Sequence, residues 1–125
     1  MDENQISKIV LNSAIEVHRL LGPGLLESVY EKALAFELTQ QGLLVQTQVP
    51  VTFKYKQLVF EDGFRADVII NQSVVLELKS VAAITDLHKK QLLTYIKLLD
   101  MKLGMLINFN VQLLKDGVIR IVNGL

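Results

Sequence analysis

Three residues in the middle of the chain could do chemistry together: Asp67, Glu77 and Lys79. If Asn71-Gln72-Ser73 forms the loop of a β-hairpin, Asp67 faces Glu77 across the paired strands, and Lys79 emerges on the same face. Two opposed carboxylates repel each other, and a cation between them would offset that repulsion. Mg²⁺ prefers carboxylate oxygens, and a nearby lysine can orient water or stabilise charge on a phosphate. The hairpin therefore has the groups that metal-assisted phosphodiester hydrolysis requires.

The same hairpin has a second interpretation. Its register also places Arg65 opposite Lys79, so the two cations could simply neutralise Asp67 and Glu77 on a solvated face. The apolar sequence around these charges argues against a solvated face. The hairpin alone leaves both interpretations open. On the opposite face the register predicts a wholly apolar set: Phe64, Ala66, Val68, Ile70, Val74, Leu76 and Leu78.

Hydrophobic periodicity predicts the elements that hold this hairpin. A first helix capped by Asp2 or Asn4 ends at Gly22-Pro23-Gly24, and a turn at Lys56-Gln57 joins the first two strands. Asp62-Gly63 suggests a break in the second strand. The remaining predicted elements are helices over 25–41 and 85–99, the latter capped by Thr85, and strands over 45–55, 58–70, 74–79, 103–109 and 118–122.

The order of these elements predicts the fold class. It reads α-α-β-β-β-α-β-β, which indicates an α/β (α+β) fold with a mixed sheet flanked by helices. The strand–helix–strand unit over 74–109 predicts a right-handed crossover between parallel strands. The earlier strands should pair as antiparallel hairpins.

Composition limits the classes of function. The chain has 125 residues, 50% hydrophobic, which predicts a single domain over 1–125. The absence of Cys excludes disulfides and zinc ribbons, and two His exclude a His-rich metal site. Thirteen basic and 13 acidic residues give a net charge of zero, which argues against a strongly basic DNA-binding monomer but not against a local patch. No apolar run is long enough to span a membrane, and the polar start Met1-Asp2-Glu3-Asn4 lacks a signal-peptide pattern. We therefore expect a cytoplasmic protein.

Several blocks of the sequence resemble a known family. Asp67 followed, after nine residues, by Glu77-Leu78-Lys79 resembles the D…(D/E)xK signature of the PD-(D/E)xK nuclease superfamily. Within it, the chain is more similar to the GxxExxY proteins, because Gly24 to Tyr30 fits that motif residue for residue. The other blocks that match this family's pattern are 17–23, 91–95 and 104–109. One departure is Ala66, where the superfamily's name has Pro.

The resemblance implies a restriction-endonuclease-like αβββαβ core with an extra N-terminal helix. It also implies a Mg²⁺- or Mn²⁺-dependent nuclease acting on nucleic acid, with DNA expected rather than RNA. In that reading Asp67 and Glu77 hold the metal, Glu27 adds a third ligand, and Lys79 is the catalytic lysine. Glu27 also has a simpler interpretation, because a Glu in the first turn of a helix is favoured by the helix dipole.

Five further residues are candidates for binding substrate or supporting the site. Gln91 and Tyr95 lie four residues apart on one helix face and resemble a Gln-x-x-x-Tyr motif near the metal or the DNA. Tyr30 shares a helix face with Glu27, Arg65 lies beside Asp67, and His18 falls within a block that matches the family. Each of the helical residues could instead be an ordinary packing or capping residue.

The alternatives to a nuclease are a non-catalytic nucleic-acid- or protein-binding module on the same fold, and an assembly protein whose charged face is structural. A neutral chain of this size has little surface for gripping a duplex. We therefore expect a homodimer, or a protein partner that supplies basic surface, and no association with a membrane.

Overall fold

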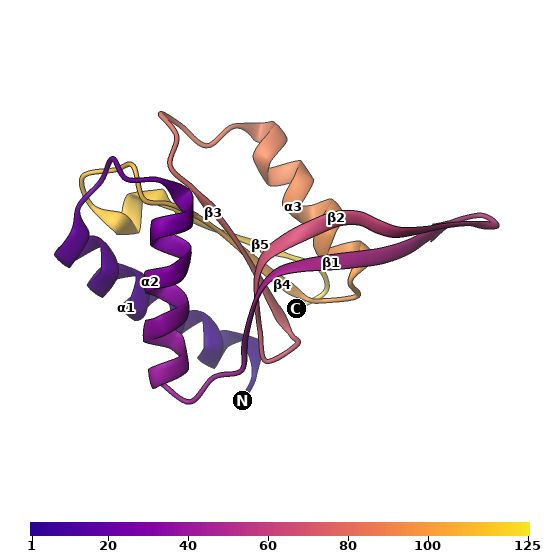
Figure 1. Cartoon of the computed structure of the whole chain (residues 1–125), viewed down its shortest axis with the longest axis horizontal. Helices are drawn as coiled ribbons and strands as arrows, with labels where there is room; N and C mark the ends of the chain where they lie inside the picture. The colour runs from indigo at the N-terminus through magenta and orange to yellow at the C-terminus, as the bar shows by residue number, and fades with distance from the viewer.

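A computed structural model describes all 125 residues (Figure 1). Its elements follow the predicted order, with one short 3₁₀ helix added before the last strand. They are α1 (Glu3–Leu21), α2 (Glu27–Gln40), β1 (Val45–Tyr55), β2 (Leu58–Ile70), β3 (Val74–Lys79), α3 (Asp86–Leu98), β4 (Leu103–Asn108), η1 (Leu114–Gly117) and β5 (Val118–Val122).

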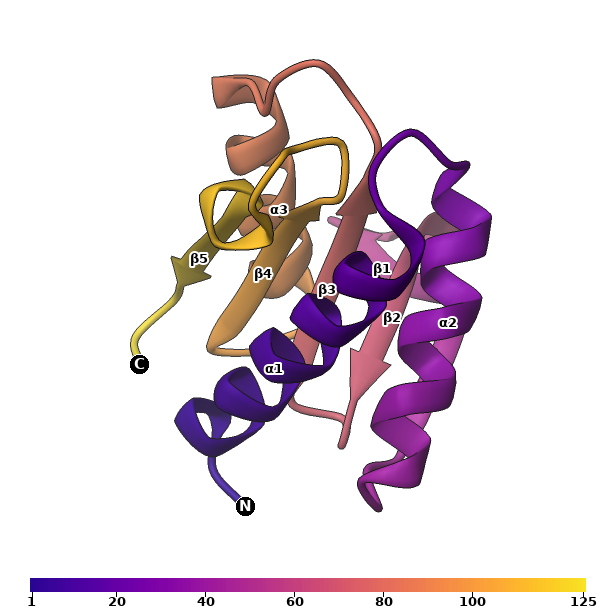
Figure 2. The same cartoon turned by 90° about the vertical axis from the view of Figure 1, so that its left-hand side faces the viewer.

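The five strands form one mixed sheet in the order β1-β2-β3-β4-β5. β3 and β4 are parallel, and β1–β2 and β2–β3 are antiparallel, as predicted. The last strand, β5, pairs with β4 in antiparallel orientation. Helices α1 and α2 cover one face of the sheet, and α3 covers the other (Figures 1 and 2). A large apolar cluster fills the first interface and a smaller one fills the second. The predicted α+β fold is confirmed.

The helix starts follow from their capping residues. The Asp2 side chain accepts a hydrogen bond from the Gln5 backbone N–H, and Thr85 does the same for His88. Both predicted caps are therefore present. The turn after α1 depends on Gly22 and Gly24, which have φ angles of 74° and 93°. Glycine adopts this left-handed region without the penalty that a Cβ imposes.

The β2–β3 hairpin has the predicted register. Ile70 pairs with Val74, Ile69 with Val75, and Val68 with Leu76. The regular ladder ends there, so the predicted pairing of Arg65 with Lys79 is not formed; Arg65 instead pairs with Pro50 of β1.

The predicted apolar face is wrong at its N-terminal end. Val68 packs in the cluster beneath α1 and α2, whereas Ala66 and Phe64 pack in the cluster beneath α3. β2 therefore changes face at Asp67. β1 does the same at the neighbouring Gln48, whose φ of 48° is left-handed. A period-two pattern cannot reveal such an irregularity, because it assumes that every residue is extended.

Beyond this change of face, β1 and β2 continue as a two-stranded arm, which we define as residues 52–63 (Figure 1). The expected break at Asp62-Gly63 is absent, since β2 is one strand. A Cβ at Gly63 would collide with the ring of Phe53, so this glycine permits close packing rather than a turn. None of the helices is both long enough and apolar enough to cross a membrane.

Candidate active site

The side chains of Asp67 and Glu77 each accept a hydrogen bond from a backbone N–H of the neighbouring strand. The Asp67 N–H donates to Glu77 Oε2 at 2.9 Å, and the Leu78 N–H donates to Asp67 Oδ2 at 2.9 Å. These two bonds continue the hairpin where its regular ladder has ended. As a result, the two carboxyl groups predicted to face each other are fixed side by side.

Burial makes this pair electrostatically unfavourable. Glu77 is only 6% exposed, and its pKa is raised from 4.5 to about 8, first by burial and then by the charge of Asp67. Lys79 acts in the opposite direction, because its positive charge favours the ionised form of Glu77. The fold therefore holds two acidic groups where a nearby positive charge would be strongly stabilising.

Tyr95 of α3 lies close enough to Asp67 and Glu77 for their charges to affect its pKa. Its pKa is raised by burial and by the charges of Glu77 and Asp67, so its phenol stays protonated. The ring stacks on Phe64, with centroids 4.0 Å apart, and this contact is made possible by the change of face at Asp67. Gln91, one turn earlier on α3, is exposed. The structure thus places Tyr95 within electrostatic reach of the two carboxylates and leaves Gln91 open to solvent.

The turn before α2 sets the position of Glu27. Tyr30 is fully buried; its hydroxyl donates to the Gly22 carbonyl at 2.6 Å and accepts from the Leu25 N–H at 3.0 Å. Its ring stacks on Phe109 with centroids 4.3 Å apart. Tyr30 therefore fastens the turn to the end of the sheet, and this contact accounts for a tyrosine at that position.

We expect Tyr30→Phe to lower the free energy of unfolding by about 1–2 kcal/mol, because it leaves the Gly22 carbonyl and the Leu25 N–H without their partner. Urea denaturation followed by circular dichroism measures this change. The exposed Tyr55 provides the control, and Tyr55→Phe should change stability by less than about 0.5 kcal/mol. Equal effects of the two substitutions would contradict the assignment.

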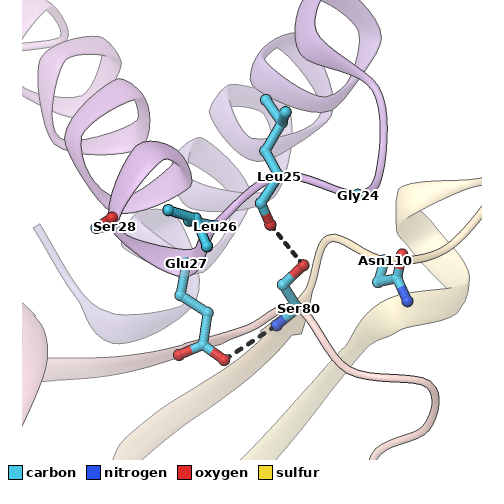
Figure 3. Close-up of a pocket in the computed structure, with 7 residues that line it drawn as sticks. All are labelled: Gly24, Leu25, Leu26, Glu27, Ser28, Ser80 and Asn110. Carbon is cyan, nitrogen blue, oxygen red and sulfur yellow. Dashed lines mark hydrogen bonds between the residues drawn. The ribbon is translucent and has the colours of Figure 1, made fainter.

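The side chain of Glu27 points toward Ser80, the residue after Lys79. Its Oε2 accepts from the Ser80 N–H at 3.3 Å, and Ser80 Oγ donates to the Leu25 carbonyl at 2.8 Å (Figure 3). These residues border a hollow of about 600 Å³, which we call the Ser80 hollow and which is lined by Gly24, Leu25, Leu26, Glu27, Ser28, Ser80 and Asn110. The sequence reasoning did not identify Ser80.

A second hollow of about 280 Å³ adjoins the first, since Glu27 and Ser28 line both. We call it the acidic hollow. Its lining brings Asp67 together with Glu27 and Glu31 of α2, and with Gln48 of β1. The sequence reasoning missed Glu31 and Gln48. One signal was present for Glu31, because it lies four residues after Glu27 and therefore on the same helix face.

A comparison with known protein families assigns the chain to a superfamily. The family model of the PD-(D/E)XK nuclease superfamily matches residues 4–121. The chain belongs to this superfamily. No curated protein and no solved structure matches it. The match spans nearly the whole fold, and it agrees with the mixed sheet and flanking helices described above. Nucleases of this superfamily generally use divalent metals.

The donor set of the acidic pair is compatible with such a metal. Asp67 and Glu77 offer hard carboxylate oxygens, which Mg²⁺ and Mn²⁺ prefer, and no thiol is present in this PD-(D/E)XK chain. Burial and the charge of Asp67 raise the pKa of Glu77, and the positive charge of Lys79 offsets this rise only in part. As the side chains lie, no three acidic or histidine residues converge closely enough to hold an ion.

Other residues that border the site hold the loops around it. The buried Asn108 side chain accepts from the Val81 N–H and donates to the Val81 carbonyl, which fixes the chain just beyond Ser80. Its signal in the sequence was a single polar residue at the end of a very apolar strand. His18, predicted as a site residue, is buried and its Nε2 donates to the Val111 carbonyl at 2.8 Å.

Arg65 lies away from the acidic pair. It forms an exposed ion pair with Asp62 in the arm at 3.4 Å. The structure therefore brings together Asp67, Glu77 and Tyr95 around the end of the β2–β3 hairpin, with Glu27 across the adjoining hollows. Arg65 and His18 make contacts elsewhere.

Proposed function

We propose that this protein is a Mg²⁺- or Mn²⁺-dependent nuclease that hydrolyses phosphodiester bonds in nucleic acid, with DNA as the expected substrate. The observation that carries the proposal is the pair formed by the half-buried Asp67 and the buried Glu77, fixed by two hydrogen bonds from backbone N–H groups within a chain of the PD-(D/E)XK superfamily. The match of Gly24 to Tyr30 with the GxxExxY motif further supports membership of that smaller family.

In this proposal Asp67 and Glu77 hold the cation, and Glu27 supplies a further carboxylate from α2. A divalent cation there would polarise the phosphodiester and acidify a water molecule. Lys79, the last residue of β3, orients the attacking water and stabilises the negative charge that develops on the phosphate. The phenol of Tyr95, whose pKa is raised by burial and by the charges of Glu77 and Asp67, would supply a further hydrogen-bond donor to the substrate.

The two hollows provide room for the substrate. They run along the start of α2 and past the end of β3, so a nucleic-acid strand lying in them would pass Asp67, the member of the acidic pair that lines the acidic hollow. Gln91 is exposed one turn from Tyr95 and could contact that strand. Tyr30 and His18 would then act through the turn and the loop that they hold, and Arg65 would contact substrate only at the base of the arm.

A metal-dependent cleavage assay tests the proposal. Wild type and Glu77→Ala are incubated with single- and double-stranded DNA and RNA in EDTA, Mg²⁺ or Mn²⁺. We expect cleavage by the wild type with metal, and none in EDTA or by the variant. The same samples are titrated with Mn²⁺.

Two negative results have different meanings. If the wild type binds Mn²⁺ and Glu77→Ala does not, while neither cleaves, the metal site is real and the substrate or a partner protein is missing from the assay. If neither protein binds Mn²⁺, the metal-dependent nuclease must be abandoned, and the charged pair is structural.

The chain's charge supports a proposal about its assembly. With a net charge of zero, phosphate neutralisation by one copy is weak, so we propose that a second copy or a protein partner contributes basic surface. Gel filtration together with the cleavage assay checks this point. A strict monomer that cuts DNA efficiently by itself would contradict it.

A further inference from the structure

Gln48 joins two carboxylates from distant parts of the chain. Its side-chain nitrogen lies 3.1 and 3.3 Å from the two carboxylate oxygens of Glu31, and 3.4 Å from Asp67 Oδ1. Glu31 belongs to α2 and Asp67 to β2, so the amide crosses the acidic hollow. An amide NH₂ has two donors and no net charge, which lets it serve two acceptors at once.

The backbone of Gln48 is held in an uncommon conformation at this point. Its φ of 48° lies in the left-handed region, which residues with a Cβ seldom occupy. Thr47 pairs with Val68 and Val49 pairs with Ala66, so the residues on either side are in a normal ladder. The irregularity is therefore confined to Gln48 and the facing Asp67, where both strands change face.

The place of the amide matters because Asp67 has only two carboxylate oxygens. Oδ2 accepts from the Leu78 N–H, whereas Oδ1 is within reach of Gln48, which lines the acidic hollow together with Asp67. Gln48 donates to this Oδ1 and, at the same time, to the carboxylate of Glu31. A neutral donor thus lies between the two acceptors that a cation entering the hollow would also need.

We infer that Gln48 is a positioning residue that competes with the metal: its amide holds Glu31 and Asp67 in the metal-free protein, and these hydrogen bonds are exchanged for bonds to a divalent cation when the metal binds. This inference rests on the proposed metal-dependent function. It also adds Glu31 to the carboxylates that can approach the metal. Because a divalent cation interacts with carboxylates far more strongly than a neutral amide, the exchange favours the metal at sufficient concentration.

Removing the amide should therefore tighten metal binding. A hydrogen bond to a charged group is modest in net free energy, so we expect Gln48→Gly to lower the Kd for Mn²⁺ by about 3–10-fold. Glycine is the preferred replacement because it accepts a φ of 48° without strain. Gln46→Gly is the matched control, since Gln46 is an exposed glutamine on the same strand.

The experiment is a Mn²⁺ titration by isothermal calorimetry of wild type, Gln48→Gly, Gln48→Ala and Gln46→Gly, at one pH near neutrality. Circular dichroism of each metal-free sample confirms that the fold is retained. Tighter binding by both Gln48 variants, with Gln46→Gly equal to wild type, supports the inference. The alanine variant keeps a Cβ, so agreement between the two separates loss of the amide from added backbone freedom.

The outcomes distinguish this inference from the proposed function. If wild type binds Mn²⁺ and the Gln48 variants bind it equally well or more weakly, Gln48 does not compete with the metal, and only the inference is overturned. If neither the wild type nor any variant binds Mn²⁺, the proposed function itself fails and the inference fails with it.

Discussion

Lys79→Met is expected to lower the rate of metal-dependent cleavage by about 10²–10³-fold, the usual effect of removing one group that stabilises developing charge. Methionine retains much of the length and apolar character of the lysine side chain, which is partly buried at the end of β3. The Kd for Mn²⁺ should not increase, because the substitution removes a positive charge from beside the acidic pair. Single-turnover cleavage of a labelled oligonucleotide and a Mn²⁺ titration measure the two effects separately.

This separation distinguishes the lysine from the carboxylates. Glu77→Ala should lose both metal binding and cleavage, whereas Lys79→Met should lose cleavage alone. Lys8→Met serves as a control, because Lys8 is an exposed lysine on α1. If Lys79→Met cleaved within about threefold of the wild-type rate, a catalytic role for Lys79 would be excluded.

Glu77→Gln is expected to raise the free energy of unfolding of the metal-free protein above pH 8. In the folded state the pKa of Glu77 is about 8, against 4.5 for the ordinary side chain. This difference sets an upper limit of about 5 kcal/mol on the cost of ionising the buried carboxyl. Glutamine keeps an oxygen that can accept from the Asp67 N–H, so the stabilisation comes from removing the charge.

The sign of the pH dependence follows from whether the Glu77 carboxyl is protonated in the folded and in the unfolded protein. Below pH 4.5 the carboxyl is protonated in both states and Glu77 imposes no electrostatic cost. Between pH 4.5 and about 8 the unfolded chain releases the proton while the folded protein keeps it, so the wild type loses stability as pH rises. Above about pH 8 the cost is constant. The advantage of Glu77→Gln should therefore grow through this window and then level off.

Urea denaturation in EDTA at pH 5 and pH 9 measures this difference. Glu61→Gln is the matched control, since Glu61 is an exposed glutamate in the arm and its replacement should have little effect at either pH. Equal stability of wild type and Glu77→Gln at pH 9 would show that burial of the carboxyl costs nothing. Such a cost at a site is consistent with selection for function rather than for stability.

Local sequence signals were sufficient for most of the fold. Asp2 and Thr85 cap the helices that they were predicted to cap, and the loop Asn71-Gln72-Ser73 set the hairpin register. The very apolar strand at Leu103–Asn108 is buried throughout, as a parallel central strand should be. These predictions succeeded because each depends on residues close together in the sequence.

The composition of the site was harder to predict. Asp67 and Glu77 were found because they lie in one hairpin, but Glu31 and Gln48 meet Asp67 only through tertiary packing. Gln48 looked like a solvent-facing residue of an alternating strand, and nothing in its neighbours indicated a left-handed φ. The change of face at the facing Asp67 also placed Phe64 and Ala66 on the side of the sheet opposite to the one predicted. The prediction therefore failed where a local rule is broken at the proposed site.

The arm formed by residues 52–63 should open locally more readily than the rest of the molecule. It is a two-stranded ribbon with no third strand beside it, and Tyr55, Leu58 and Val59 near its tip are more than half exposed. Such ribbons contribute few buried contacts and form a cooperative unit less stable than the core. The boundary between this unit and the sheet runs close to Gln48 and Asp67. Transient separation of the arm's strands would therefore extend toward the acidic hollow, while Glu77 stays buried in β3 at the centre of the sheet.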